Sequence, residues 1–173
     1  MHISSKECLA EALQKLGIAN LRPQQEAPME AILNNEDVII LMPTSGGKSL
    51  LYQLPAVMEP DSLTLVISPL KALQFDQVES LRSKGIRAAV LNSDLSAAEH
   101  RDVLEDMTEH GGLLYLAPEQ LQNMAVADAA YRHLTVLPSM KRTLPQAKDD
   151  FRKAYGKIAA SLTRSPVIRR SLR

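Results

Sequence analysis

One stretch of the chain carries its clearest structural signal, because residues 38–49 read VIILMPTSGGKS. The run Val38–Met42 is apolar without interruption, which is typical of a β-strand buried on both faces. Pro43–Gly47 has the residues of a turn, and Lys48–Val57 has the pattern of a helix that follows it. The stretch therefore predicts a strand, a tight glycine-containing loop and a helix in direct succession.

Alternating helix and strand signals continue on both sides of this stretch. Before it, Lys6–Leu16 has an apolar helical stripe that Gly17 closes, and a second helical stretch begins at Pro23. After it, the predicted elements are strand Leu63–Ile67, helix Lys71–Lys84, strand Ala88–Leu91, a helix from the Ser96/Glu99 capping box to about Glu109, and strand Leu113–Leu116. Strands that alternate with helices in this way predict an α/β fold with a mostly parallel central sheet flanked by helices.

Length and composition exclude several classes of protein. A chain of 173 residues corresponds to one domain, and 45% hydrophobic with 23% charged residues is ordinary for a globular protein. We expect no membrane span or secretion signal, because long apolar runs are absent and the first residues lack an apolar core. Cys8 is the single cysteine, which excludes an internal disulfide framework and a cysteine-rich zinc site. An aromatic content of 3% argues against base stacking as the main activity.

The formal net charge of zero hides a division of the chain into two segments. Residues 1–123 contain 9 Lys and Arg against 17 Asp and Glu, which gives −8. Residues 124–173 contain 11 against 3, which gives +8. The basic segment is interpreted either as an ordinary basic tail or as an arm that contacts nucleic acid.

The loop itself has the residues of a phosphate-binding site. It matches the pattern G-x-x-x-x-G-K-[ST], except that Met42 replaces the first glycine. Gly46 and Gly47 would let the backbone N–H groups approach phosphate oxygens, while the helix dipole adds a favourable field. Lys48 would reach the β- and γ-phosphates, and Ser49 would offer its hydroxyl to Mg²⁺. The alternative is a glycine-rich turn with an incidental Lys-Ser pair.

Further motifs in order along residues 9–123 resemble RecQ-type superfamily 2 ATP-dependent DNA helicases. The motifs are LGIANLRPQQ at 16–25, MPTSGGKS at 42–49 with YQLP at 52–55, SPLKAL with DQ at 68–77, LNS at 91–93 and APE at 117–119. Several motifs in register are far more specific than any one alone. The resemblance implies the first RecA-like motor domain of an enzyme that couples ATP hydrolysis to 3′–5′ DNA unwinding in recombination and repair. It also implies Mg²⁺ as cofactor, single-stranded DNA and duplex junctions as partners, and a bacterial cytoplasmic location.

The resemblance also implies roles for individual residues in the nucleotide site. Arg22 and Gln25 would contact adenine, since an amide side chain can form bidentate hydrogen bonds with that base. Thr44 and Ser45 would belong to the phosphate loop with Gly46, Gly47, Lys48 and Ser49, and Lys48 would be the catalytic residue. Ile18 and Leu21 stand where the family usually has aromatic residues, which predicts weaker stacking on the base. The alternative for Gln25 is a glutamine on a helix surface.

On the DNA side, Ser68, Lys71 and Gln77 are implied to face a DNA strand, mostly through its phosphates. The alternative for Lys71 is a solvated residue at the start of a helix. Gln120 stands where the family usually has arginine, which removes one charged contact.

One expected motif is missing from the printed sequence. The family's Asp-Glu-Ala-His tetrad, whose Asp holds Mg²⁺ and whose Glu orients the attacking water, is absent. A second motor domain is absent too. We therefore expect an incomplete sheet at the C-terminal end, nucleotide binding that is weak at best, and no unwinding by these 173 residues. The alternative function is a non-catalytic nucleic-acid-binding module that uses the basic segment as an electrostatic arm.

Residues 124–173 are further interpreted as helicase sequence that is partly out of frame. Ser139–Thr143, written TCG ATG AAG CGC ACN and read from the third base, encodes Asp-Glu-Ala-His. Asp150–Arg152 resembles the segment that follows the tetrad in the family, and Arg169–Arg173 in the shifted frame resembles its next motif. The interpretation implies a decayed gene or an error in the DNA sequence, and the alternative is a real protein with a divergent basic tail.

Overall fold

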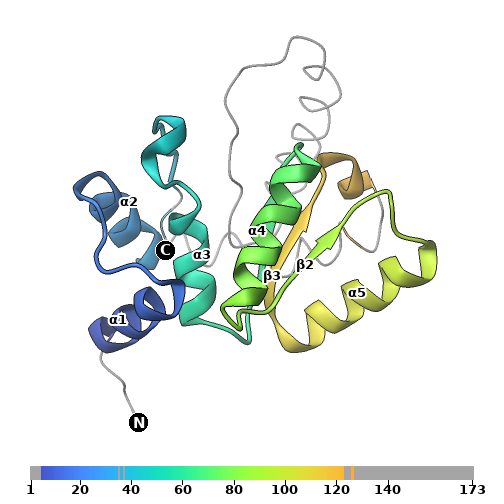
Figure 1. The fold of residues 1–173 in the computed structure, drawn as a ribbon, viewed down its shortest axis with the longest axis horizontal. Helices are drawn as coiled ribbons and strands as arrows, with labels where there is room; N and C mark the ends of the chain where they lie inside the picture. The colour runs from blue at the N-terminus through green and yellow to red at the C-terminus, as the bar shows by residue number, and fades with distance from the viewer. Residues whose placement is uncertain (1–4, 35, 37, 123–125, 127–173) are drawn as a thin grey trace.

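The computed structural model describes residues 5–34, 36, 38–122 and 126, which Figure 1 shows in colour. The elements are α1 (Ser5–Leu16), α2 (Pro23–Leu33), the 3-10 turn η1 (Thr44–Gly46), α3 (Leu50–Met58), β1 (Leu63–Ile67), α4 (Lys71–Ser83), β2 (Ala88–Leu91), α5 (Ala97–His110), β3 (Gly112–Leu116) and the turn η2 (Pro118–Gln122). The predictions for 124–173 lie outside the described residues, apart from Val126.

The three strands form a parallel sheet in the order β1-β3-β2. Leu63 pairs with Gly112, and Ala88 pairs with Leu113, so all three strands start at one end of the sheet. Parallel neighbours need long crossover connections, which α4 and α5 provide. The prediction of an α/β fold with a parallel sheet flanked by helices is confirmed, and strands 63–67 and 88–91 have the predicted bounds.

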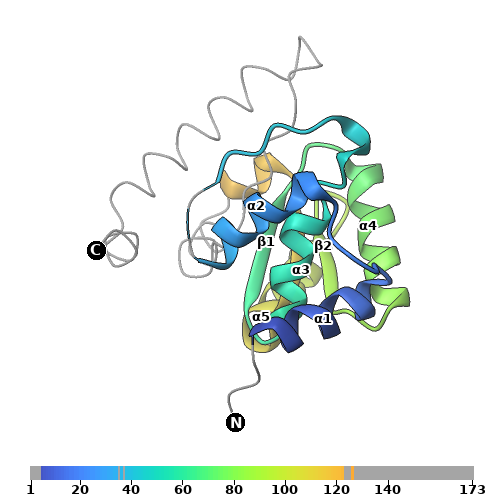
Figure 2. The same ribbon diagram turned by 90° about the vertical axis from the view of Figure 1, so that its left-hand side faces the viewer.

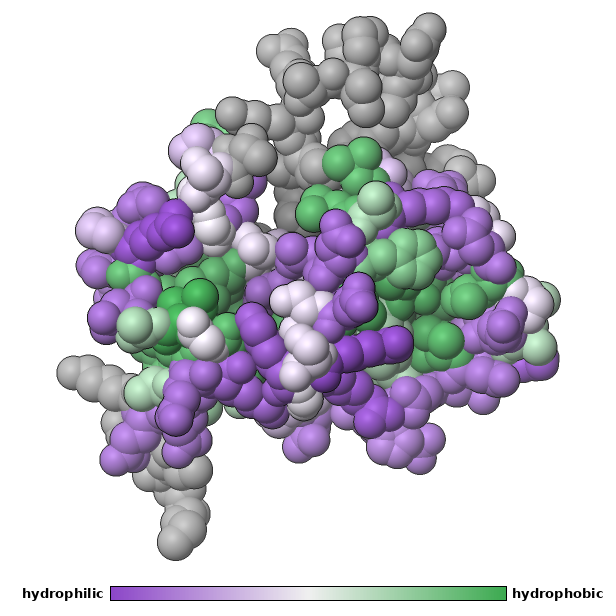
Figure 3. All heavy atoms as spheres, in the orientation of Figure 1, coloured by the Kyte–Doolittle hydropathy of each residue, from purple (hydrophilic) through white to green (hydrophobic). Residues whose placement is uncertain are grey.

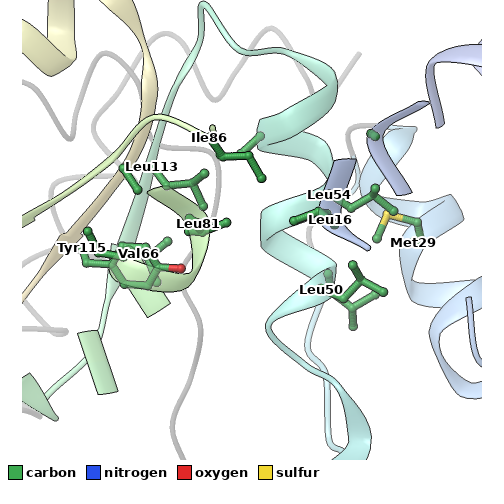
Figure 4. Packing of buried hydrophobic residues seen from close by; sticks show 14 of the residues in the cluster. Leu16, Met29, Leu50, Leu54, Val66, Leu81, Ile86, Leu113 and Tyr115 are labelled. Carbon is green, nitrogen blue, oxygen red and sulfur yellow. The ribbon is translucent and has the colours of Figure 1, made fainter. Parts of the chain in front are cut away.

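Helices cover both faces of the sheet, which explains why its strands are almost wholly apolar. One core layer joins Val66 and Leu113 of the sheet to α1, α2, α3 and α4, and the other joins Leu65 and Leu114 to α5. Figure 2 shows α1, α2 and α3 in front of the sheet, and Figure 4 shows the side chains of the first layer. Leu54 of α3 is fully buried there, and a leucine buried to this degree contributes about 1.5–3 kcal/mol.

The prediction of a buried strand at Val38–Met42 is wrong in this structure. The segment has no regular secondary structure and pairs with no strand among the described residues. Met42 is buried and Ile40 packs on the first core layer, whereas Ile39 and Leu41 are 89% and 90% exposed. The apolar run favours a strand, but a strand also needs a neighbour for its backbone N–H and C=O groups.

The helix boundaries differ little from their predictions. The helix after the phosphate loop begins at Leu50, two residues later than predicted, because Gly47 still has a left-handed conformation. The Ser96/Glu99 capping box is confirmed, since each side chain accepts a hydrogen bond from the backbone N–H of the other residue. Within the described part of the chain, no helix combines the length and the apolar character needed to cross a membrane.

Candidate functional site

The phosphate loop folds as a tight turn that leads directly into α3. Thr44, Ser45 and Gly46 form η1, and Gly47 follows with φ +73° and ψ 34°. A Cβ on Gly47 would lie 2.4 Å from Nε2 of Gln25, so this position requires glycine both for its backbone angles and for space. A Cβ on Gly46 would lie 3.0 Å from that of Met42. The structure therefore favours glycine at position 47, and the predicted role of both glycines in letting the backbone approach phosphate stays a prediction.

Backbone donors gather at the end of this loop. Among the described residues, the N–H groups of Lys48 and Ser49 donate no hydrogen bond, whereas Leu50 and Leu51 donate to carbonyls of the preceding turn. Free N–H groups at the start of a helix, together with the helix dipole, attract anions. The loop thus has the donor set that a phosphate group needs.

The Lys48 side chain folds back over the loop. Its Nζ donates to the carbonyl oxygens of Met42 and Pro43, at 2.9 and 2.8 Å. These are neutral acceptors, and a charge-assisted bond to a phosphate oxygen is roughly twice as strong as a neutral bond. The ammonium is therefore positioned beside the loop and can exchange its partners for phosphate. Its predicted phosphate contact and catalytic role stay predictions.

Arg22 and Gln25 connect the start of α2 to the loop. Nη1 of Arg22 donates to the carbonyl of Ser45 at 2.9 Å. Nε2 of Gln25 donates to the carbonyl of Gly47 at 3.0 Å, and Oε1 accepts from the N–H of Arg22 at 2.8 Å. Gln25 is 2% exposed, so it is a buried brace of the phosphate loop rather than a residue of the helix surface.

This bracing role is one that the sequence analysis missed. The contact of either side chain with adenine stays a prediction. The sequence carried a signal only for the bond to Arg22, because Gln25 is the third residue of a helix that starts at Pro23, where a Gln side chain can bond back to the residue before the helix.

Ser49 precedes the first turn of α3 and is half-buried. Among the described residues, no group of three His, Cys, Asp or Glu side chains could hold a metal ion. Mg²⁺ commonly binds through few protein ligands together with substrate phosphates and water. One hydroxyl in a phosphate loop therefore fits a Mg²⁺ ion that the nucleotide itself carries.

The residues predicted to face DNA fall into two places. Ser68 and Lys71 lie at the carboxyl end of β1, where Ser68 is buried and its N–H donates to Leu116. Nζ of Lys71 donates to Oγ of Ser93 and to Oδ1 of Asp94, both at 2.8 Å. Gln77 lies farther along α4 and accepts a hydrogen bond from Nε2 of Gln53 at 2.6 Å, so its side chain faces α3. The structure thus brings Ser68 and Lys71 to one end of the sheet and separates Gln77 from them.

A polar cluster that the sequence analysis did not single out joins α3 to the sheet. Nε2 of Gln53 also donates to the hydroxyl of Tyr115 at 3.4 Å, and the rings of Tyr52 and Tyr115 meet edge to face with centroids 6.3 Å apart. Burial, with the neighbouring Tyr115, raises the pKa of Tyr52 far above its ordinary value, so the phenol stays neutral. The cluster fixes α3, and with it the phosphate loop, relative to the sheet.

Comparisons with known proteins show which family this chain matches. Residues 22–166 match the DEAD/DEAH box helicase family. The chain is 37% identical over 164 residues to the ATP-dependent DNA helicase RecQ of Synechocystis, and 38% identical over 152 residues to the probable ATP-dependent DNA helicase RecS of Bacillus subtilis. These alignments cover 91% and 84% of this chain but 34% and 29% of the relatives. The chain therefore spans about a third of the length of these relatives.

A solved structure supports the fold assignment alone. The helicase MrfA, in a crystal structure with DNA, superposes with a TM-score of 0.60 over 76% of this chain and 21% of its own, at 23% identity. The likeness supports an α/β fold whose parallel sheet, flanked by helices, is consistent with part of a RecA-like domain.

Proposed function

Because this chain belongs to the DEAD/DEAH box helicase family and is similar to RecQ-type helicases over most of its length, we propose that it is the ATP-binding part of a 3′–5′ DNA helicase motor. One observation carries the proposal: the N–H groups of Lys48 and Ser49, at the start of α3, donate no hydrogen bond within the described part of the chain, and the Lys48 ammonium lies against the carbonyls of the same loop. This is the donor set that the triphosphate of a nucleotide requires.

In the proposed complex, the loop N–H groups bind phosphate oxygens, and the helix dipole of α3 favours their negative charge. Lys48 leaves the carbonyls of Met42 and Pro43 and pairs with the β- and γ-phosphates. Gln25 and Arg22 hold the loop in this shape through the carbonyls of Gly47 and Ser45. The loop is thus organised before the nucleotide arrives, which reduces the entropic cost of binding.

Ser49 is proposed to contribute its hydroxyl to a Mg²⁺ ion that the nucleotide carries. When bound, Mg²⁺ neutralises charge on the phosphate oxygens. Adenine is proposed to bind near Arg22 and Gln25, at the junction of α2 and the loop. Ile18 is 36% exposed and Leu21 is half-buried, so these aliphatic side chains offer limited apolar contact and no aromatic stacking to the base.

We propose that these 173 residues bind nucleotide without turning it over. The Asp-Glu-Ala-His tetrad is absent from the sequence, and with it the carboxylate that orients the attacking water. Phosphoryl transfer depends almost wholly on positioning and charge stabilisation, so this loss removes a large share of the catalytic effect.

The proposed DNA contact lies at the carboxyl end of β1, near Ser68 and Lys71, where Nζ of Lys71 bonds to Oγ of Ser93. Ligands of parallel α/β sheets bind at this end of the strands. The relatives are named DNA helicases, and the structural neighbour MrfA was solved with DNA. The alternative proposal, nucleic-acid binding through an arm at 124–173, rests on the +8 charge of that segment alone.

A titration with a fluorescent ATP analogue tests the nucleotide proposal. In the presence of Mg²⁺ the chain is expected to bind the analogue saturably and to release it when unlabelled ATP is added. Lys48→Ala is expected to weaken binding at least tenfold, because it removes the ammonium that we propose pairs with the β- and γ-phosphates. Lys84→Ala is the charge-matched control, since that side chain bonds to the carbonyl of Leu16, away from the loop. Equal affinities for the wild type and Lys48→Ala would refute the proposal.

The out-of-frame origin of part of residues 124–173 has its own test. Resequencing the gene across these codons and beyond is expected to recover the tetrad and a second motor domain, either in one continuous frame or in a shifted one. A confirmed frame with no helicase-like sequence downstream would contradict this origin and favour a real basic arm.

A further inference from the structure

The acidic side chain of Asp94 lies next to Lys71, at the place where we propose that DNA binds. Its Oδ1 is 2.8 Å from Nζ of Lys71, and Oγ of Ser93 accepts from the same ammonium at 2.8 Å. Lys71 is the first residue of α4, and Ser93 and Asp94 follow β2 by two and three residues. The pair therefore lies at the carboxyl end of the sheet, toward which the strand arrows point in Figure 1.

Local structure directs the Asp94 carboxylate toward this place. The N–H of Asp94 donates to Oδ1 of the buried Asn92 at 2.9 Å, which closes a tight turn after β2. The carbonyl of Asn92 in turn bonds to Nε2 of His100 at 2.7 Å, on α5. Asp94 thus projects from a turn that a buried residue and a neighbouring helix both hold.

The electrostatics of this corner favour an anion. The start of α4 carries the positive end of the helix dipole, and no side chain caps it. Lys71 adds a full positive charge at the same place. A carboxylate at 2.8 Å from that ammonium occupies the position that a phosphate oxygen of a DNA strand would take.

The surroundings of the pair are open. The side chains of Lys71 and Asp94 are 40% and 60% exposed, and the adjacent Leu70 and Leu73 are 42% and 40% exposed. Figure 3 shows apolar surface over this end of α4. Pairs as exposed as this one are weak in water, so an incoming phosphate can displace the carboxylate.

We propose that Asp94 is a positioning residue that holds Lys71 and competes with the DNA phosphate for its ammonium. The proposal rests on the proposed contact between Lys71 and DNA. Asp94 keeps the side chain extended toward the strand-binding end of the sheet and also lowers the affinity for single-stranded DNA. A DNA phosphate must therefore displace the Asp94 carboxylate before it pairs with Lys71, whereas a lysine without such a partner would be open to the phosphate at once.

The test measures binding of a fluorescein-labelled oligo-dT strand to the full chain by anisotropy, over a series of salt concentrations. Asp94→Asn is expected to bind about two- to fivefold more tightly at low salt, because the competitor is neutral. The slope of log affinity against log salt concentration is expected to become more negative by up to about 0.7, which is the value for one additional phosphate contact on a single strand. Asp94→Glu keeps the charge and is expected to bind like the wild type.

Two controls separate this effect from a general change in charge. Asp61→Asn makes the same change in net charge, but Asp61 lies before β1, at the opposite end of the sheet. It is expected to leave the affinity unchanged. In a Lys71→Ala background, Asp94→Asn is expected to have no effect, since the ammonium for which Asp94 competes is gone.

The outcomes distinguish this inference from the DNA proposal on which it rests. If Lys71→Ala weakens binding but Asp94→Asn does not strengthen it, Asp94 is no competitor and the DNA contact still stands. If Asp61→Asn strengthens binding as much as Asp94→Asn, the effect is one of net charge and the inference is wrong. If Lys71→Ala leaves the affinity unchanged, the contact at Lys71 fails and the inference fails with it.

Discussion

At the scale of single residues, Gln25 shows how one side chain can support a whole loop. Its amide satisfies the carbonyl of Gly47 and the N–H of Arg22 while being almost fully buried. Gln25→Ala is expected to reduce the free energy of unfolding by about 1–3 kcal/mol, because it removes the two hydrogen bonds by which the buried amide holds Arg22 and Gly47. Urea denaturation measures this difference. The exposed neighbour Gln24 is the control, and Gln24→Ala is expected to change stability by less than about 0.5 kcal/mol.

Gly47 gives a second prediction at this scale, with a control that has the same backbone angle. Gly47→Ala places a Cβ 2.4 Å from Nε2 of Gln25, whereas a Cβ on Gly17, at φ +75°, would meet nothing within 4 Å. Gly17→Ala is expected to cost about 1–2 kcal/mol from left-handed strain alone. Gly47→Ala is expected to cost more and to weaken nucleotide binding, as thermal unfolding with and without ATP would measure. Equal losses of stability in Gly47→Ala and Gly17→Ala would show that the Gln25 side chain moves aside without a penalty.

The residue scale also shows the reach of sequence-based prediction for the site. The spacing of Gly46, Gly47, Lys48 and Ser49 predicted a loop before a helix, and that local geometry is confirmed. The bond between Gln25 and Gly47 joins residues 22 apart. Such a contact depends on how α2 packs against the loop, which no local pattern encodes.

At the scale of elements, the segment Val38–Met42 shows that a sequence with the apolar pattern of a strand does not by itself pair with other strands. Its side chains alternate, with Met42 at 7% exposure and Ile39 at 89%. Ile39→Ala is therefore expected to change the free energy of unfolding by less than about 0.5 kcal/mol, and Met42→Ala to lower it by about 2–5 kcal/mol. Chemical denaturation of the two variants measures both. A cost for Ile39→Ala as large as for Met42→Ala would mean that the segment is a strand buried on both faces.

The strands show why one element differs from its prediction while others agree. Leu63–Ile67 and Ala88–Leu91 have the predicted bounds because both lie beside β3 and under helices on each face. Val38–Met42 has an equally apolar sequence but no neighbour among the described residues. Apolar composition predicts burial, whereas membership of a sheet depends on residues far away in the chain.

At the scale of the whole molecule, the phosphate loop is present, whereas the Asp-Glu-Ala-His tetrad, which the family uses for catalysis, is absent from the sequence. We expect the chain to hydrolyse ATP no faster than its Lys48→Ala variant, with or without single-stranded DNA, because the tetrad whose Glu would orient the attacking water is absent from the sequence. A coupled phosphate-release assay measures this rate. DNA-stimulated hydrolysis by the wild type that Lys48→Ala abolishes would contradict the expectation.

The central claim is that the loop before α3 binds the phosphates of ATP through its backbone. The most direct measurement is a titration of the ¹⁵N-labelled chain with Mg·ATP, followed by its amide resonances. The largest shifts are expected for Lys48 and Ser49, whose N–H groups donate no hydrogen bond within the described structure. Lys48→Ala should strongly reduce those shifts. Saturable binding that leaves these two amides unmoved, or no binding at all, would contradict the claim.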